Sequence, residues 1–193
     1  MKNKETKPYF FIGFGGFNQY FCKVAEILRK ENEIISGCFT VGYKAKLRLD
    51  EYDARFVDKD SYEEVYSQFN LNDSDNQKYE EKIYELDNKY GSLWKFAYSD
   101  RQLIQYNHDH MYGSYALSHD QILRYLVNWF LFFENRFIDG KYTHVINYAT
   151  ASSISLIMSK VIKRLGGHYL EFSTLGKPDR FVFFEGSYTS NIV

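Results

Sequence analysis

Residues 9–28 read YFFIGFGGFNQYFCKVAEIL, and this stretch decides the fold. It opens with a short apolar run, Tyr9–Ile12, and continues through a glycine-rich turn, Gly13-Phe14-Gly15-Gly16. The apolar residues beyond the turn recur at helical spacing and are Phe17, Phe21, Val24, Ala25 and Leu28. The pattern predicts a strand, a tight turn and a helix at the start of the chain.

The rest of the chain repeats this alternation of strands and helices. Further strands are predicted at residues 34–41, 55–57, 143–148, 168–172 and 181–184. Helices are predicted at residues 17–30, 62–69, 78–89, 93–106, 119–138 and 154–165. Because strands that alternate with helices form parallel sheets covered on both faces, we expect an α/β fold with a Rossmann-like open parallel sheet. We expect one domain over residues 1–193, with a helical excursion around residues 58–106.

The longest predicted helix, residues 119–138, is apolar on most of its faces. Such a helix is usually buried on more than one side. Four polar residues on it argue against a membrane span: Arg124, Asn128, Glu134 and Arg136. The polar N-terminus precedes only about four apolar residues, too few for a signal peptide. We therefore expect a cytoplasmic protein, which could also work at the inner face of the membrane.

Charge and cysteine content exclude several classes of protein. The formal net charge is −1, which argues against a general nucleic-acid binder. Cys22 and Cys38 show neither zinc spacing nor a disulfide framework, which fits a reducing compartment. Their simplest role is that of small buried apolar residues.

The glycine-rich turn is the first candidate site. Glycines after a first strand let the backbone approach a ligand, and the helix behind them favours an anion. The dinucleotide fingerprint G-x-G-x-x-G requires a third glycine where this chain has Asn18, and no Walker lysine follows. The turn therefore either faces a ligand of another kind or is purely structural. We take Gly15, Gly16 and Asn18 as candidate substrate-binding residues.

A second turn, Ala149–Ser153, follows the predicted strand at residues 143–148. Ligands of open α/β sheets lie beyond the carboxyl ends of the strands, where both turns are predicted to meet. Thr150 and Ser152 offer hydroxyl groups for substrate binding, although capping of the next helix explains serine and threonine here equally well.

Three further segments hold chemically active side chains. His108-Asp109-His110 could supply a metal pair or an acid–base pair, but its spacing matches no complete metal site, and a solvated loop is the simpler interpretation. Asp100 could form a helix-end ion pair with its neighbour Arg101, or the pair could clamp an anion. Arg180 could reach a phosphate or a sugar carboxylate, although a turn is the simpler use of this segment.

The chain resembles the N-terminal Rossmann-like half of a GT-B glycosyltransferase, and more narrowly the bacterial capsular and surface polysaccharide biosynthesis proteins. The resemblance is one of arrangement over most of the chain, and each single motif is weak. The segments that carry it are FFIGFGGFNQYF (10–21), YGSLWKFAYSDRQL (90–103), the helix 121–137, THVINYATASSISLIMSKVIKRLGGHYL (143–170), TLGKPDR (174–180) and the strand RFVFF (180–184).

In that family two Rossmann-like domains face each other across a cleft. The N-terminal domain binds the acceptor and the C-terminal domain binds the nucleotide-sugar donor. The resemblance implies that this chain is the acceptor-side domain, that the donor binds to a C-terminal domain missing from this chain, and that no metal or other cofactor is needed. It supplies no catalytic base, and we take His108, Asp109 and His110 as the first catalytic candidates.

Two other classes of function stay open from the sequence. The first is a Rossmann-like nucleotide-binding or regulatory module that acts with a partner chain. The missing third glycine argues against its dinucleotide form. The second is a hydrolase or esterase acting on sugars, for which no Gly-x-Ser-x-Gly nucleophile motif is present.

Overall fold

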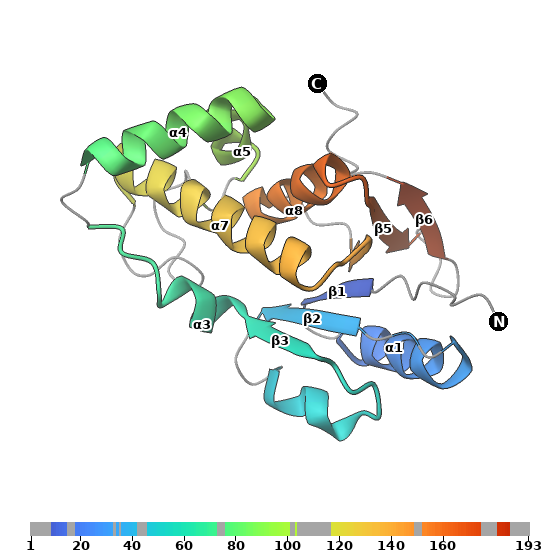
Figure 1. Cartoon of the computed structure of the whole chain (residues 1–193). Helices are drawn as coiled ribbons and strands as arrows, with labels where there is room; N and C mark the ends of the chain where they lie inside the picture. Colours follow the sequence, from blue (N-terminus) through green and yellow to red (C-terminus); the bar gives the residue numbers. More distant parts are fainter. Residues whose placement is uncertain are drawn as a thin grey trace.

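The structure is a computed structural model that describes residues 9–14, 18–32, 34, 36–41, 46–72, 76–100, 103, 117–148, 152–174 and 181–185. Its centre is a six-stranded sheet in the order β3-β2-β1-β4-β5-β6 (Figure 1). The strands are β1 (Tyr9–Phe14), β2 (Ser36–Val41), β3 (Asp58–Ser61), β4 (His144–Tyr148), β5 (His168–Thr174) and β6 (Phe181–Glu185). The helices are α1 (Asn18–Asn32), the 3-10 turn η2 (Arg48–Glu51), α3 (Tyr62–Tyr66), α4 (Asn76–Tyr90), α5 (Trp94–Tyr98), α7 (His119–Asp139) and α8 (Ser153–Arg164).

The predicted α/β fold with a Rossmann-like open sheet is confirmed. Strands β1 to β5 run parallel to one another, and β1 lies between β2 and β4. Chain order reverses at this point, because the chain moves from β1 outward to β3 and then returns to β4 on the other side. The switch point of the sheet therefore lies between β1 and β4, where such folds bind their ligands.

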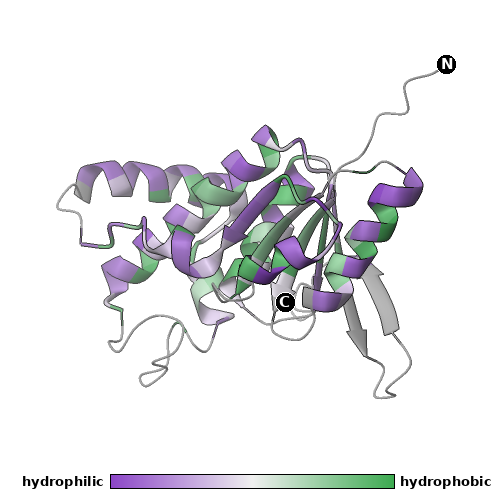
Figure 2. Ribbon diagram, turned by 90° about the horizontal axis from the view of Figure 1, so that it is seen from below, coloured by the Kyte–Doolittle hydropathy of each residue, from purple (hydrophilic) through white to green (hydrophobic). Residues whose placement is uncertain are grey.

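Helices cover both faces of the sheet. One face packs against α1 through a small cluster that includes Phe11, Cys22 and Cys38. The other face packs against α3, α7 and α8, and α4 and α5 form a further layer on the outside of α7 (Figure 1). Figure 2 shows the apolar strands at the centre and α4, at the upper left, coloured mainly as hydrophilic. The excursion predicted at residues 58–106 thus begins with strand β3, and its described helices α3, α4 and α5 lie on the α7 side of the sheet.

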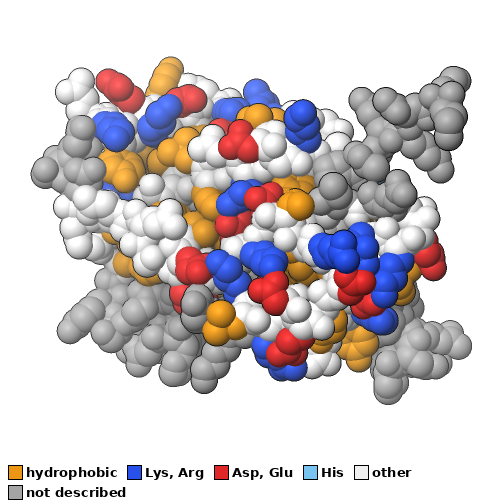
Figure 3. Space-filling model, turned by 60° about the horizontal axis from the view of Figure 1, so that its bottom comes forward, with side chains coloured by type: hydrophobic (Ala, Val, Ile, Leu, Met, Phe, Trp, Pro, Cys, Tyr) orange, Lys and Arg blue, Asp and Glu red, His pale blue; other side chains and the backbone are white. Residues whose placement is uncertain are grey.

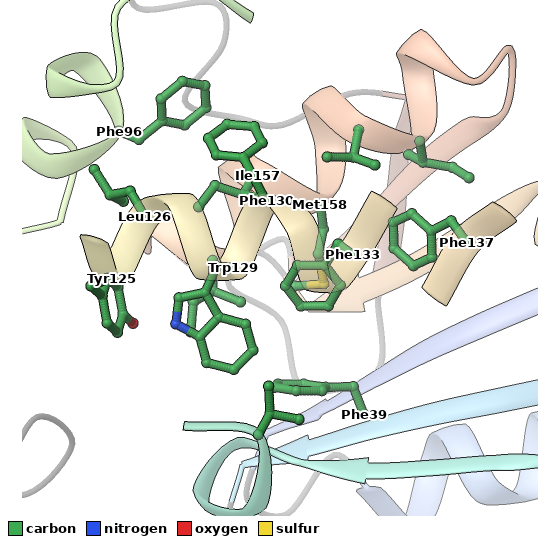
Figure 4. Packing of buried hydrophobic residues seen from close by; sticks show 14 of the residues in the cluster. Phe39, Phe96, Tyr125, Leu126, Trp129, Phe130, Phe133, Phe137, Ile157 and Met158 are labelled. Carbon is green, nitrogen blue, oxygen red and sulfur yellow. The ribbon is translucent and has the colours of Figure 1, made fainter. Parts of the chain in front are cut away.

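Helix α7 is the centre of the larger hydrophobic core, as its apolar sequence predicts. Trp129 and Phe133 are fully buried and stack with ring centroids 5.5 Å apart, and both meet Phe39 of β2 (Figure 4). On the opposite side of α7, Phe130 packs against Phe96 of α5, with the two ring centroids 5.0 Å apart. The helix begins at a capping box. The Ser118 hydroxyl accepts from the backbone N–H of Gln121, and the Gln121 side chain accepts from the backbone N–H of Ser118.

Three predicted boundaries are wrong. The third strand lies at Asp58–Ser61 and not at residues 55–57, because Asp58 to Ser61 pair with Gly37 to Thr40 of β2. The helix predicted at residues 93–106 begins as α5, which ends at Tyr98. Asp100 lies beyond that end and accepts a hydrogen bond from the backbone N–H of Ser153 in α8. The turn η2 lies between residues 41 and 55, where neither a helix nor a strand is predicted, and its Leu49 is buried.

The last strand departs from the parallel pattern. Strand β6 pairs with β5 in the antiparallel direction, from Leu170 opposite Glu185 to Thr174 opposite Phe181. The two strands are close in sequence. A short connection allows an antiparallel pair, whereas a parallel pair would need a crossover of a dozen or more residues.

The face of the molecule that carries α1 and η2 mixes both signs of charge (Figure 3). Arg29 bonds Asp53, and Lys59 pairs with Asp50. These charged side chains thus neutralise one another in pairs.

Candidate functional site

The candidate site is the edge of the sheet where β1 and β4 end and α1 and α8 begin, here named the switch-point edge. Strand β1 ends at Phe14, and β4 ends at Tyr148. Gly13 pairs with Thr40 of β2, and Ile12 pairs with Asn147 of β4. The two turns singled out in the sequence therefore both start at this edge.

The start of α8 is built by serine side chains. Ser152 is the N-cap, with extended backbone, and its hydroxyl oxygen accepts from the backbone N–H of Ser155 at 3.2 Å. The Ser152 hydroxyl also lies 3.0 Å from the hydroxyl oxygen of Ser155 and donates to it. Ser152 is partly buried, whereas Ser153 and Ser155 are buried, so Ser152 is the most exposed of the three serines.

Asp100 holds the same helix start from a distant part of the chain. Its Oδ2 accepts from the backbone N–H of Ser153 at 3.0 Å and from the Ser153 hydroxyl at 2.8 Å. Its Oδ1 faces the backbone N–H of Leu103 at 3.3 Å. Asp100 is only 1% exposed, so a buried carboxyl group takes the helix N–H that a bound anion would otherwise take.

A buried polar network continues inward from α8 to the strands. Asn147 donates through Nδ2 to the Ser155 hydroxyl at 3.0 Å and to the Tyr169 hydroxyl at 2.8 Å. Glu171 is 1% exposed and is the residue paired with Asn147 across β4 and β5. Burial, and next the charge of Glu171, raise the pKa of Tyr169 well above its ordinary value, so this phenol stays a hydrogen-bond donor.

These groups gather polar chemistry at one edge of an apolar sheet. A buried polar network is costly unless its members bond one another, and here Ser152, Ser155, Asn147 and Tyr169 form one connected chain. The edge can accept hydrogen bonds from a ligand through serine oxygens next to a buried carboxyl group. Among the described residues, no group of three or more His, Cys, Asp or Glu side chains is placed to hold a metal ion.

A second polar cluster ties β3 to the end of α7. Arg136 donates to Asp58 through Nη1 and to Asp60 through Nη2, both at 2.7 Å. Tyr142 donates to the other oxygen of Asp58. Burial raises the pKa of the Asp60 carboxyl, and the neighbouring Arg136 guanidinium opposes that rise. This cluster lies at β3, at the far side of β2 from the switch-point edge.

The structure describes two of the predicted site residues. Ser152 lies at the start of α8, and Asn18 is the first residue of α1. The other candidates lie outside the described residues: Gly15, Gly16, His108, Asp109, His110, Thr150 and Arg180. Arg101, the expected ion-pair partner of Asp100, also lies outside them.

Sequence reasoning missed two members of the site, Asn147 and Glu171, and the contact made by a third, Asp100. Asp100 was singled out, but its bond to Ser153 joins residues 53 positions apart, and no local pattern predicts it. Asn147 and Glu171 did carry a signal, since each is a polar residue inside an otherwise apolar buried strand. A buried polar side chain of this kind requires partners, which marks it for attention.

Comparison with models of protein families, with curated proteins and with solved structures gives no match to this chain. Within the part of the chain that the structure describes, none of the helices has the length and apolar character needed to cross a membrane. The function is therefore inferred from the geometry of the switch-point edge.

Proposed function

We propose that the protein binds a saccharide at the switch-point edge and is the acceptor-side domain of a glycosyltransferase in capsular or surface polysaccharide biosynthesis. The proposal places the protein in the cytoplasm, at the inner face of the membrane. The single observation that carries it is the bonding of Asp100 to the first residue of α8.

The Asp100 carboxyl group disfavours a phosphate at this helix start. Two like unit charges about 4 Å apart repel by about 4 kcal/mol at an effective dielectric constant of about 20. The dipole of a helix returns at most about 2 kcal/mol to an anion at its N-terminus. The repulsion exceeds the attraction, so a neutral ligand fits this edge better than a nucleotide phosphate does.

A saccharide has the complementary chemistry. Its hydroxyl groups are neutral and both donate and accept, and Ser152 offers an oxygen at the surface end of the polar network. In the proposed arrangement this chain positions the acceptor hydroxyl, and a second domain carries the nucleotide-sugar donor.

One observation favours an alternative, a nucleotide-binding or regulatory module that acts with a partner chain. Helix α1 follows the glycine-rich turn and has no acidic residue in its first turn. The first turn of α1 itself therefore adds no negative charge at this N-terminus. A phosphate would favour α1 over α8.

A titration of matched cap variants separates these functions. We would measure the affinity of neutral oligosaccharides, UDP-, GDP- and CMP-sugars, NAD and ATP for the wild type, Ser152→Ala and Ser118→Ala. Both substitutions remove an N-cap serine and cost about 1 kcal/mol of stability, but only Ser152 lies at the switch-point edge.

If the proposal is correct, an oligosaccharide raises the melting temperature, because a ligand at about 100 times its Kd adds about 2.7 kcal/mol to the free energy of unfolding. The proposal expects Ser152→Ala to weaken this affinity and Ser118→Ala to leave it unchanged. Stabilisation by NAD or ATP, with no response to any saccharide, would establish the nucleotide module instead.

A further inference from the structure

A groove on the outer helical layer is formed by segments of the chain other than those at the switch-point edge. It runs between α4 and α7 and has a volume of about 400 Å³. This lies within the range of roughly 300–1,000 Å³ seen for ligand-binding pockets. Its floor is apolar and aromatic, formed by Tyr79, Ile83 and Leu123.

One side of the groove is a regular stripe on α4. Glu80, Ile83, Tyr84 and Asp87 line it at the spacing i, i+3, i+4 and i+7, which is one face of a helix. Tyr84 is 72% exposed although it borders an apolar floor. Tyrosine is among the residues that most often anchor protein–protein contacts.

The charge of the groove is acidic. Glu80, Asp87 and Asp120 line it against a single basic residue, Arg124. Arg124 is 7% exposed, its guanidinium lies 5.0 Å from the Tyr79 ring centroid, and it donates to the carbonyl of Leu71. The positive charge is thus held inside the fold.

The carboxyl groups at the rim face solvent. The side chain of Asp120 is 82% exposed, and Glu80 is exposed. Asp87 accepts from the backbone N–H of Leu93 at 2.8 Å through Oδ1, which leaves its second oxygen available at the groove. A ligand that enters the groove therefore meets negative charge along an apolar floor.

We propose that this groove binds a basic amphipathic helix of a partner protein. Side chains of two neighbouring helices, α4 and α7, line the groove, and its apolar residues suit the apolar face of a third helix. Lysine and arginine on its flanks complement Glu80 and Asp120 and would set its partner specificity. This inference does not depend on the function proposed for the switch-point edge.

The test uses two synthetic helical peptides with the same leucine and phenylalanine face. One carries lysine and arginine on both flanks, and the other carries glutamate there. Fluorescence anisotropy would give the Kd of each for the full chain at low and at physiological ionic strength. The basic peptide should bind at least roughly tenfold more tightly than the acidic one, and salt should narrow the difference.

Neighbouring residues provide a matched control. Glu80→Lys and Glu81→Lys make the same charge change at consecutive exposed positions of α4, but only Glu80 lines the groove. Glu80→Lys and Tyr84→Ala should each weaken binding of the basic peptide several-fold, and Glu81→Lys should not. Circular dichroism confirms that each variant is folded.

Three outcomes overturn the proposal. Equal affinity for both peptides would mean non-specific apolar adhesion. An equal effect of Glu80→Lys and Glu81→Lys would mean that the peptide is attracted by the overall negative charge of α4 and does not bind in the groove. Absence of binding by the basic peptide at millimolar concentration would mean that the groove takes no helix of this chemistry.

Discussion

Asp100 shows how much a single side chain decides in this protein. It lies after the short helix α5, yet it fixes the start of α8 through two hydrogen bonds to Ser153. In the proposed function, the same carboxyl group disfavours an anionic ligand at the switch-point edge. One residue therefore joins the outer helical layer to the candidate site.

Asp100→Asn should destabilise the protein by about 1–3 kcal/mol, because an amide replaces an acceptor oxygen and leaves a buried donor poorly bonded. Urea unfolding followed by circular dichroism measures this. Asp120→Asn is the control, since its side chain is 82% exposed and should change stability by less than about 0.5 kcal/mol. Equal effects of the two substitutions would mean that Asp100 holds nothing in place.

Asp60 should make stability depend on pH in an unusual direction. Burial raises its pKa above the ordinary value of 3.8, so the folded state binds a proton more readily than the unfolded state. Its contribution to stability is then greatest below pH 3.8 and falls as pH rises toward the raised pKa.

The free energy of unfolding of wild type and Asp60→Asn, measured across acidic pH, isolates this contribution. The stability of the wild type relative to the variant should decrease as pH rises through that window. A constant difference, or one that increases with pH, would show that Arg136 outweighs burial at this site.

At the scale of elements, α7 organises the larger core because it is buried on two sides. One side meets the sheet through Trp129 and Phe133, and the other meets α5 through Phe130. The apolar periodicity of residues 119–138 predicted this burial. The sequence could not indicate which elements lie on each side, since that depends on contacts between distant segments.

Phe133→Ala should therefore cost about 3–5 kcal/mol, as large-to-small changes in a packed core do. Ile138→Ala on the same helix is the control, because Ile138 is 56% exposed. Denaturant unfolding should show a large loss for the first and a small one for the second. Comparable losses would mean that α7 is not packed as described.

At the scale of the whole molecule, the order of strands and helices could be predicted because hydrophobic runs and turn residues are local signals. Residues 9–12 and 144–148 were placed correctly as strands in this way, whereas Gly13 and Phe14, predicted to be in the turn, extend β1. The position of β3 was missed by a few residues, since its polar sequence DKDS lacks the apolar pattern of a buried strand. Ser152 was predicted at the site, whereas the role of Asp100 arises from tertiary contact alone.

The chain should unfold as one cooperative unit, because the larger core joins α4, α5, α7 and α8 to the sheet. In a Trp94→Phe variant the buried Trp129 becomes the single tryptophan reporter. Its fluorescence and the far-UV circular dichroism should then give coincident urea transitions. Separate transitions would show that the outer helical layer is an independent unit.

The most direct test of the central claim is hydrogen–deuterium exchange with and without a saturating neutral oligosaccharide. The account predicts slower exchange at the start of α8, residues 152–156, and at the start of α1, with α4 unchanged. Ligand-induced protection by ATP or NAD at α1, with none from any oligosaccharide, would contradict a saccharide site at the switch-point edge and support a nucleotide-binding module.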